Sequence, residues 1–171
     1  GLGSGLIRNN RLVHGAHTLA GEIGHATISL HGERCSCGNV GCLETFVSGK
    51  AIARRAKEQI EDAPENITAK DVYEQANRGN KSYRKILEES ADYLAIGLIN
   101  YINTVNPRVI VLGGGVMNSA DIMMPLIKKH LRERVLIREA WDDLVLTVGQ
   151  LGEDTTLLGA AALQLQSIFI D

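Results

Sequence analysis

Several features that would point to a specialised class of protein are missing from this 171-residue chain. Its apolar runs are short, so the sequence predicts no transmembrane helix. No dense basic stretch stands out, and the net charge of −2 gives no sign of a nucleic-acid footprint. Internal repeats and low-complexity segments are absent as well. With 44% hydrophobic and 22% charged residues, the composition is typical of one globular domain with its own core.

Cysteine is scarce too, and all three cysteines lie within eight residues, at Cys35, Cys37 and Cys42. His25 stands ten positions before the first of them. One imidazole and three thiolates make the ligand count of a closed, tetrahedral Cys3His zinc site. Two glycines between the last two cysteines suit a tight knuckle that wraps a metal. Because four protein ligands leave no open position for a reactive water, the zinc is expected to be structural.

Two other interpretations of the cysteines stay open at this point. Cys35 and Cys37 are too close for an easy disulfide, because residues i and i+2 of a strand lie roughly 6.5–7 Å apart. Cys37 and Cys42 could close a small loop, but no signal-like apolar segment argues for secretion. The thiols could also be reduced and unrelated to one another. Cytosolic, reducing conditions fit zinc–thiolate chemistry, so we expect a cytoplasmic protein.

The spacing of apolar residues predicts strands, then helices, then a β–loop–α–β–α order, which is typical of the α/β class. Gly97 falls on the apolar stripe of one helix, where a neighbour can approach the backbone closely. The expected strands are 3–8 and 11–16, paired through Asn9-Asn10, then 25–30, and 109–112 and 144–148 as strands buried on both faces. The expected helices cover 44–60, 69–78 behind a capping box, 81–105, 119–134 and 157–165.

Two glycine-rich turns are candidates for nucleotide binding. Gly113-Gly114-Gly115 follows an apolar strand and precedes a helix, which is where open α/β sheets bind ligands. The chain begins in the second turn, Gly1-Leu2-Gly3-Ser4-Gly5, whose amides could meet phosphate oxygens. This beginning, without an initiator methionine, suggests the middle of a longer protein. The chain has no G-x-G-x-x-G and no Walker A lysine, so a purely structural role as sharp turns stays open for both.

Four segments together resemble the ROK family of repressors, open reading frames and sugar kinases, and the resemblance extends over essentially the whole chain. The most specific of them contains the cysteine cluster. The segments are Gly24-His25, Gly32 and Cys35-Ser36-Cys37-Gly38-Asn39-Val40-Gly41-Cys42-Leu43-Glu44 as the family signature; Gly3-Ser4-Gly5-Leu6-Ile7 as the tail of a phosphate loop; Asn106 to Gly115 as the adenosine segment; and Leu157 to Ala161 as the closing helix.

The resemblance implies the actin-like, ribonuclease-H-like ATPase fold, in which two lobes enclose the active site. Residues 1–171 would form most of the larger C-terminal lobe, with a zinc knuckle at about 25–44 inserted in it. In the family, the N-terminal lobe carries an Asp-x-Gly-Gly-Thr loop and an Asn-Asp pair whose aspartate is the general base. Neither motif occurs here. We therefore assign no catalytic residue, and we expect this chain alone to have no kinase activity.

The resemblance also implies which residues bind which ligand. Carboxylates accept hydrogen bonds from sugar hydroxyls, and zinc on one histidine nitrogen would direct the other nitrogen toward the sugar. From the residues alone, a helix-start role for Glu44 and a solvated surface position for Glu22 stay open. The implied sets are Glu22, His25 and Glu44 for the sugar; His25, Cys35, Cys37 and Cys42 for zinc; and Gly3, Gly5, Gly113, Gly114 and Gly115 for ATP, which binds with Mg²⁺.

The implied function is ATP-dependent phosphorylation of a hexose at its 6-hydroxyl by a glucokinase-like homodimer. The segments 20–25 and 42–45 resemble the family's glucokinases most, so glucose is the expected substrate and N-acetylmannosamine the next. The rival from another class is a sugar-sensing repressor of the same family, which would bind nucleic acid through an added helix-turn-helix. The glycine triplet favours nucleotide use and hence the kinase. A zinc-stabilised interaction module without a small ligand explains the glycine turns poorly.

Overall fold

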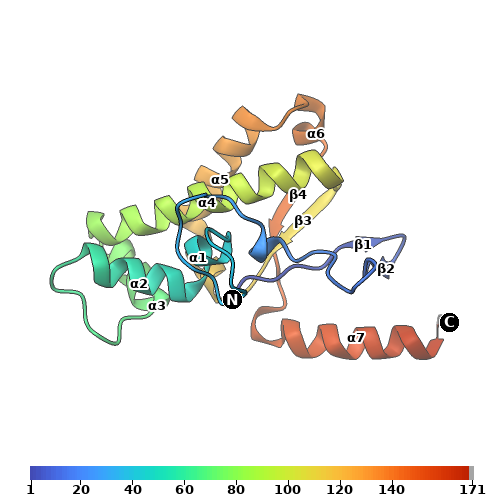
Figure 1. Cartoon of the computed structure of the whole chain (residues 1–171), viewed down its shortest axis with the longest axis horizontal. Helices are drawn as coiled ribbons and strands as arrows, with labels where there is room; N and C mark the ends of the chain where they lie inside the picture. Colours follow the sequence, from blue (N-terminus) through green and yellow to red (C-terminus); the bar gives the residue numbers. More distant parts are fainter. Residues whose placement is uncertain (170–171) are drawn as a thin grey trace.

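The computed structural model describes residues 1–169 and shows two small sheets beside a group of packed helices (Figure 1). Their sequential order agrees with the predicted α/β class. The elements are β1 (Ile7–Arg8), β2 (Arg11–Leu12), η1 (Ile23–His25), α1 (Glu44–Val47), α2 (Gly49–Gln59), α3 (Ala69–Asn77), α4 (Lys81–Val105), β3 (Val109–Leu112), η2 (Gly115–Ser119), α5 (Ala120–Arg134), α6 (Arg138–Asp142), β4 (Val145–Val148), η3 (Gly152–Asp154) and α7 (Thr155–Phe169), where η marks a 3-10 turn.

The long helix α4 is the centre of the core, and α1, α2, α3 and α5 all pack against it (Figure 1). Asn80 begins α4 by accepting a hydrogen bond from the Ser82 amide at 3.1 Å, and Asn106 ends it in the left-handed region at φ 48°. Its length agrees with the predicted helix over 81–105. The buried side chains recur at steps of three and four residues: Tyr83, Ile86, Leu87, Ala91, Leu94, Leu98 and Ile102.

The predicted helix over 44–60 is interrupted, and that part of the prediction is wrong. Ser48 has an extended ψ of 156°, which ends α1, and its hydroxyl accepts a hydrogen bond from the Ala51 amide at 3.3 Å, which caps α2. The capping box expected at α3 is present between Thr68 and Asp71. Hydrogen bonds donated by Thr68 lower the pKa of the Asp71 carboxyl. The short helix α6 was not predicted.

The two sheets are smaller than the sequence suggested. β1 and β2 form the predicted antiparallel hairpin, and Asn9 and Asn10 turn it with positive φ angles of 52° and 60°. β3 and β4 are parallel, with α5 and α6 connecting them. The strand predicted over 25–30 is wrong, because this segment makes a single bridge, Thr27 to Cys42, and its first residue belongs to η1.

Burial of the parallel strands on both faces was also predicted wrongly. One face packs on the helical core through Ile110, Leu112 and Leu146. The other face carries Val109, Val111 and Val145, which are 54–59% exposed.

The final helix, α7, is longer than predicted and extends away from the helical core (Figure 1). None of the helices within residues 1–169 is long and apolar enough to cross a membrane.

Candidate functional site

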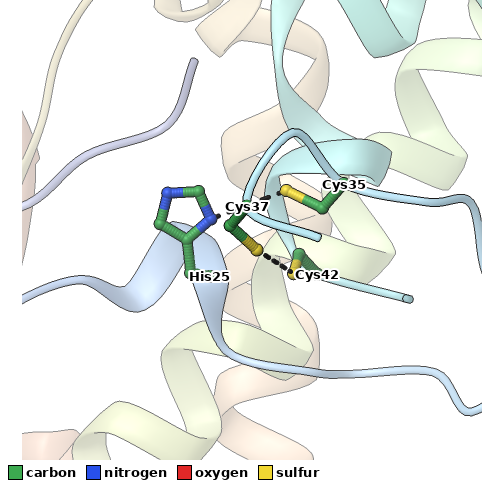
Figure 2. A group of neighbouring side chains, drawn as sticks. All are labelled: His25, Cys35, Cys37 and Cys42. Carbon is green, nitrogen blue, oxygen red and sulfur yellow. Dashed lines mark hydrogen bonds between the residues drawn. The ribbon is translucent and has the colours of Figure 1, made fainter. Parts of the chain in front are cut away.

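His25, Cys35, Cys37 and Cys42 converge on one point, and their ligand atoms all lie within 4.8 Å of one another (Figure 2). His25 Nδ1 is 3.5 Å from Cys35 Sγ, and Cys37 Sγ is 3.6 Å from Cys42 Sγ. Around a tetrahedral zinc the corresponding N···S and S···S separations are about 3.6 Å and about 3.8 Å. The four donors therefore fit zinc. All three cysteines are free thiols, so the alternative of a disulfide finds no support.

Backbone hydrogen bonds shape the knuckle that carries the three thiols. The Cys35 amide donates to the Asn39 carbonyl at 2.7 Å, and the Gly38 amide donates back to the Cys35 carbonyl at 3.0 Å. Gly38 has a φ of 94° and Gly41 a φ of 73°, values that side-chain-bearing residues rarely adopt. A Cβ at Gly41 would also lie 1.7 Å from the Ser29 carbonyl oxygen, so no larger residue fits there.

Two links hold the knuckle on the helical core. Leu43, next to the last cysteine, is fully buried, and a Cβ at Gly97 of α4 would lie only 2.4 Å from its Cδ2 atom. This contact is the close approach predicted at Gly97. On the other side, Arg54 of α2 forms an ion pair with Glu33 at 3.1 Å, ahead of the cysteines. The metal-ligand group is thus fixed to two helices of the core.

The protein gives the thiols different acidities. A hydrogen bond from the Cys37 backbone is the main cause that lowers the pKa of the Cys35 thiol to about 6. Burial is the main cause that raises the pKa of the Cys42 thiol to about 12. A divalent cation binds the thiolate form, so zinc at this position would favour the charged form of every thiol that ligates it.

Glu44 is the candidate sugar residue whose contacts are most specific. It is the first residue of α1, half-buried, and its Oε2 atom accepts a 2.8 Å hydrogen bond from the backbone amide of Leu2. No side-chain cap bond is present at the start of α1. The Leu2 carbonyl in turn lies against Gly24, where a Cβ would come within 2.0 Å of the carbonyl oxygen. Leu2 therefore sits between Glu44 and the turn that carries Glu22 and His25.

Leu2 itself is a residue that sequence reasoning missed. Its contact with Glu44 uses the backbone amide, and every non-proline residue has such a group. A leucine between two glycines carries no signal that its amide meets a carboxylate 42 positions away. Glu22 is exposed and lies just before η1, and His25 is half-buried and lies in η1 instead of the strand predicted over 25–30.

The glycines assigned to ATP binding have no atoms packed tightly against them, in contrast to the glycines of the knuckle and the core. A Cβ built on Gly113, Gly114, Gly115 or Gly3 would meet no atom within 4 Å, and at Gly5 it would make an ordinary 3.5 Å contact. Only Gly114 has a positive φ, of 84°. Tight packing therefore does not account for the triplet, which stands open at the carboxyl end of β3. Nucleotide binding by these glycines stays a prediction.

The structure combines a pair of parallel strands, an open glycine turn at the end of one of them, and a Cys3His group whose donor atoms fit a metal. These features define the class: an α/β protein with a candidate metal site. Comparison with known families gives the identity within that class. The ROK family model matches residues 1–167, so this chain belongs to the ROK family. The resemblance predicted from the cysteine segment and the glycine turns is confirmed.

Relatives of two kinds match about equally well. A glucokinase of Halalkalibacterium halodurans is 35% identical, covering 93% of this chain and 52% of that protein. A xylose repressor of Caldicellulosiruptor bescii is 31% identical, covering 95% of this chain and 43% of the repressor. The chain thus spans about half the length of these curated relatives.

Solved structures agree with the family assignment. A ROK family glucokinase from Streptomyces griseus, in complex with glucose and AMPPNP, has a TM-score of 0.83 and 31% identity. The match covers 95% of this chain and 57% of that one. ROK sugar kinases with the actin-like ATPase fold are therefore structural neighbours of this chain.

Proposed function

We propose that the protein carrying this chain is an ATP-dependent hexose kinase that phosphorylates the 6-hydroxyl of the sugar. The observation that carries the proposal is the open triplet Gly113 to Gly115 at the end of a parallel strand, which packing does not require. That is the usual place for a ligand in an open α/β sheet. The glucokinase relative in complex with glucose and AMPPNP supports both ligands.

Three side chains would hold the sugar. Ionised Glu22 and Glu44 are pure acceptors, so each can take hydrogen bonds from hydroxyl groups and together they fix the orientation of the ring. His25 turns Nδ1 toward Cys35, which leaves Nε2 for a sugar hydroxyl. Zinc held by His25, Cys35, Cys37 and Cys42 would supply rigidity, because it fixes the tautomer and direction of the imidazole.

The remaining groups would position the nucleotide. Gly113 to Gly115 would accept the adenosine, and the amides near Gly3 and Gly5 would meet phosphates of ATP bound with Mg²⁺. Phosphoryl transfer asks the protein mainly for positioning and charge stabilisation, and these residues would provide positioning. The base that takes the proton of the 6-hydroxyl is assigned by family resemblance to an N-terminal lobe outside residues 1–171. Lobe closure would then exclude water.

The test is a coupled ATP-to-ADP assay on a polypeptide of the relatives' length that contains this chain. Glucose, mannose, N-acetylmannosamine, N-acetylglucosamine and fructose are compared, with the 171-residue chain alone as the control. We expect turnover with glucose by the longer protein and none by the chain alone. The kinase proposal is wrong if no sugar gives turnover in zinc-loaded, folded protein.

A sugar-sensing repressor is the second candidate, and it is favoured by the xylose repressor that is 31% identical to this chain. Both functions would use the same sugar site, but they differ in what happens after the sugar binds. A repressor would bind the sugar without transferring a phosphoryl group to it from ATP, and the sugar would change its affinity for operator DNA. A gel-shift assay with and without the sugar, on the same longer polypeptide, separates this function from the kinase. The homodimer remains a prediction that light scattering would check.

A further inference from the structure

Residues 1–5 pack through several contacts against residues 21–25, the turn that carries Glu22 and His25, which we call the sugar-site turn. The Leu2 amide donates to Glu44 Oε2 at 2.8 Å, across 42 positions of sequence. The Leu2 carbonyl lies against Gly24, where a Cβ would be 2.0 Å from the oxygen. Two residues further on, the Ser4 hydroxyl donates to the Gly21 carbonyl, and a Cβ at Gly21 would lie 2.9 Å from the Ser4 carbonyl oxygen.

These contacts alternate along the segment. Leu2 and Ser4 touch the turn, whereas a Cβ on Gly3, between them, would meet nothing within 4 Å. One side of the segment is thus occupied by the sugar-site turn and Glu44, and the other side is open at Gly3.

We infer that the Leu2 backbone amide positions the Glu44 carboxylate for the sugar and thereby couples the glycine segment to the sugar site. The inference rests on the proposed function, in which Glu44 accepts hydrogen bonds from the sugar. Glu44 is half-buried at the start of a four-residue helix, and its side chain can adopt several rotamers there. The amide holds one carboxylate oxygen, which leaves the other in a fixed direction.

Coupling follows from the close packing. Because Gly21 and Gly24 leave no space beside Ser4 and Leu2, the segment cannot shift without moving the turn or releasing Glu44. A phosphate bound on the open side at Gly3 would therefore favour the arrangement in which Glu44 is held. By thermodynamic linkage, a sugar bound at Glu44 would favour phosphate binding by the same factor.

The test replaces the amide and the side chain of Leu2 separately. Leu2→Pro removes the N–H donor, and Leu2→Ala keeps it while shortening the side chain. Affinity for the hexose that the unsubstituted protein binds best is measured by calorimetry on zinc-loaded protein. We expect Leu2→Pro to bind the sugar about tenfold more weakly than Leu2→Ala, the range for losing a hydrogen bond to a charged group, with equal zinc content. Equal affinities for the two variants would overturn the inference.

A double-mutant cycle links the effect to Glu44. In a Glu44→Ala background, Leu2→Pro and Leu2→Ala should bind the sugar equally, because the acceptor is gone. A difference that persists in that background would show that Leu2 acts on the fold and would overturn the inference. Ser4→Ala, which loosens the segment at its other anchor, tests the same point if Leu2→Pro does not fold. Its loss of sugar affinity should vanish in Glu44→Ala, and a loss that remains counts against the coupling.

The unsubstituted protein separates this inference from the proposed function. If it binds none of the five hexoses, the sugar site itself is wrong, and the inference falls with it. If it binds a hexose and the cycle shows no coupling, only the inference is wrong. The nucleotide side has its own readout, since saturating AMPPNP should tighten sugar binding in Leu2→Ala more than in Leu2→Pro.

Discussion

Cys37 is the most exposed of the four candidate metal ligands, so its replacement tests the metal site with little direct damage to the core. We predict that Cys37→Ser loses most of its zinc and lowers the free energy of unfolding by about 4 kcal/mol or more, as losses of metal sites do. Sugar binding should fall with it, because His25 loses its fixed direction. Zinc per chain is measured by atomic absorption, with Ser36→Ala as the control that should keep the metal. A full equivalent of zinc in Cys37→Ser would remove Cys37 from the ligand set.

Glu44 should separate sugar binding from metal binding. Glu44→Gln keeps the size of the side chain but removes its charge and one acceptor, so we predict about tenfold weaker sugar binding with an unchanged zinc content. Calorimetry with glucose and a parallel metal analysis give both values. If the sugar affinity stays the same, Glu44 serves the fold only, through its contact with Leu2.

For single residues, the sequence predicted the site groups whose side chains are rare in this chain, and it did not predict those that use backbone groups or glycines. Three cysteines in eight residues, with one histidine nearby, predicted the convergence seen in Figure 2. The open state of Gly113 to Gly115 could only be suspected, because a glycine that binds a ligand and one that packs tightly look alike in sequence. The amide of Leu2 was invisible for the same reason.

Among the elements, the contact of α4 with the knuckle lends itself to a sharp test at Gly97. In an exposed helix Gly→Ala stabilises by up to about 1 kcal/mol. Here the new methyl would lie 2.4 Å from Leu43 Cδ2, so we predict a net destabilisation of about 1–3 kcal/mol from overpacking. Urea unfolding measures it. Gly159→Ala in α7 is the matched control, since its methyl meets nothing within 4 Å and should not lower stability.

Helix boundaries were predictable where a local signal sets them, and less so where tertiary contacts do. Thr68 marked the start of α3 through its capping box with Asp71, whereas the cap that Asn80 makes at the start of α4 was not recognised in the sequence. The break at Ser48 was missed, because the apolar spacing runs on across it. The strands failed differently: an apolar run such as 109–112 indicates what a strand can bury, whereas its actual burial depends on what else covers the sheet.

For the whole molecule, the core should survive removal of the metal. The buried core cluster is built mainly from α2, α3, α4 and α5, and none of its side chains ligates metal, although Leu43 next to Cys42 belongs to it. We predict that a chelator such as EDTA abolishes sugar binding while far-UV circular dichroism keeps most of its helical signal. Added zinc should restore binding. Cooperative loss of all helical signal on chelation would show instead that the knuckle holds the entire fold together.

The apolar surface of helix α7 affects how this chain would behave if it were produced in a cell. Residues 155–169 contain no charged side chain, and Leu157, Leu158, Leu163 and Leu165 are 47–72% exposed. These leucines, and separately the exposed valines of the parallel strands, are exposed apolar side chains of the kind that holdase chaperones and quality-control proteases recognise. Produced by itself, the chain should accumulate poorly and self-associate as its concentration rises, however well the metal-ligand knuckle is formed.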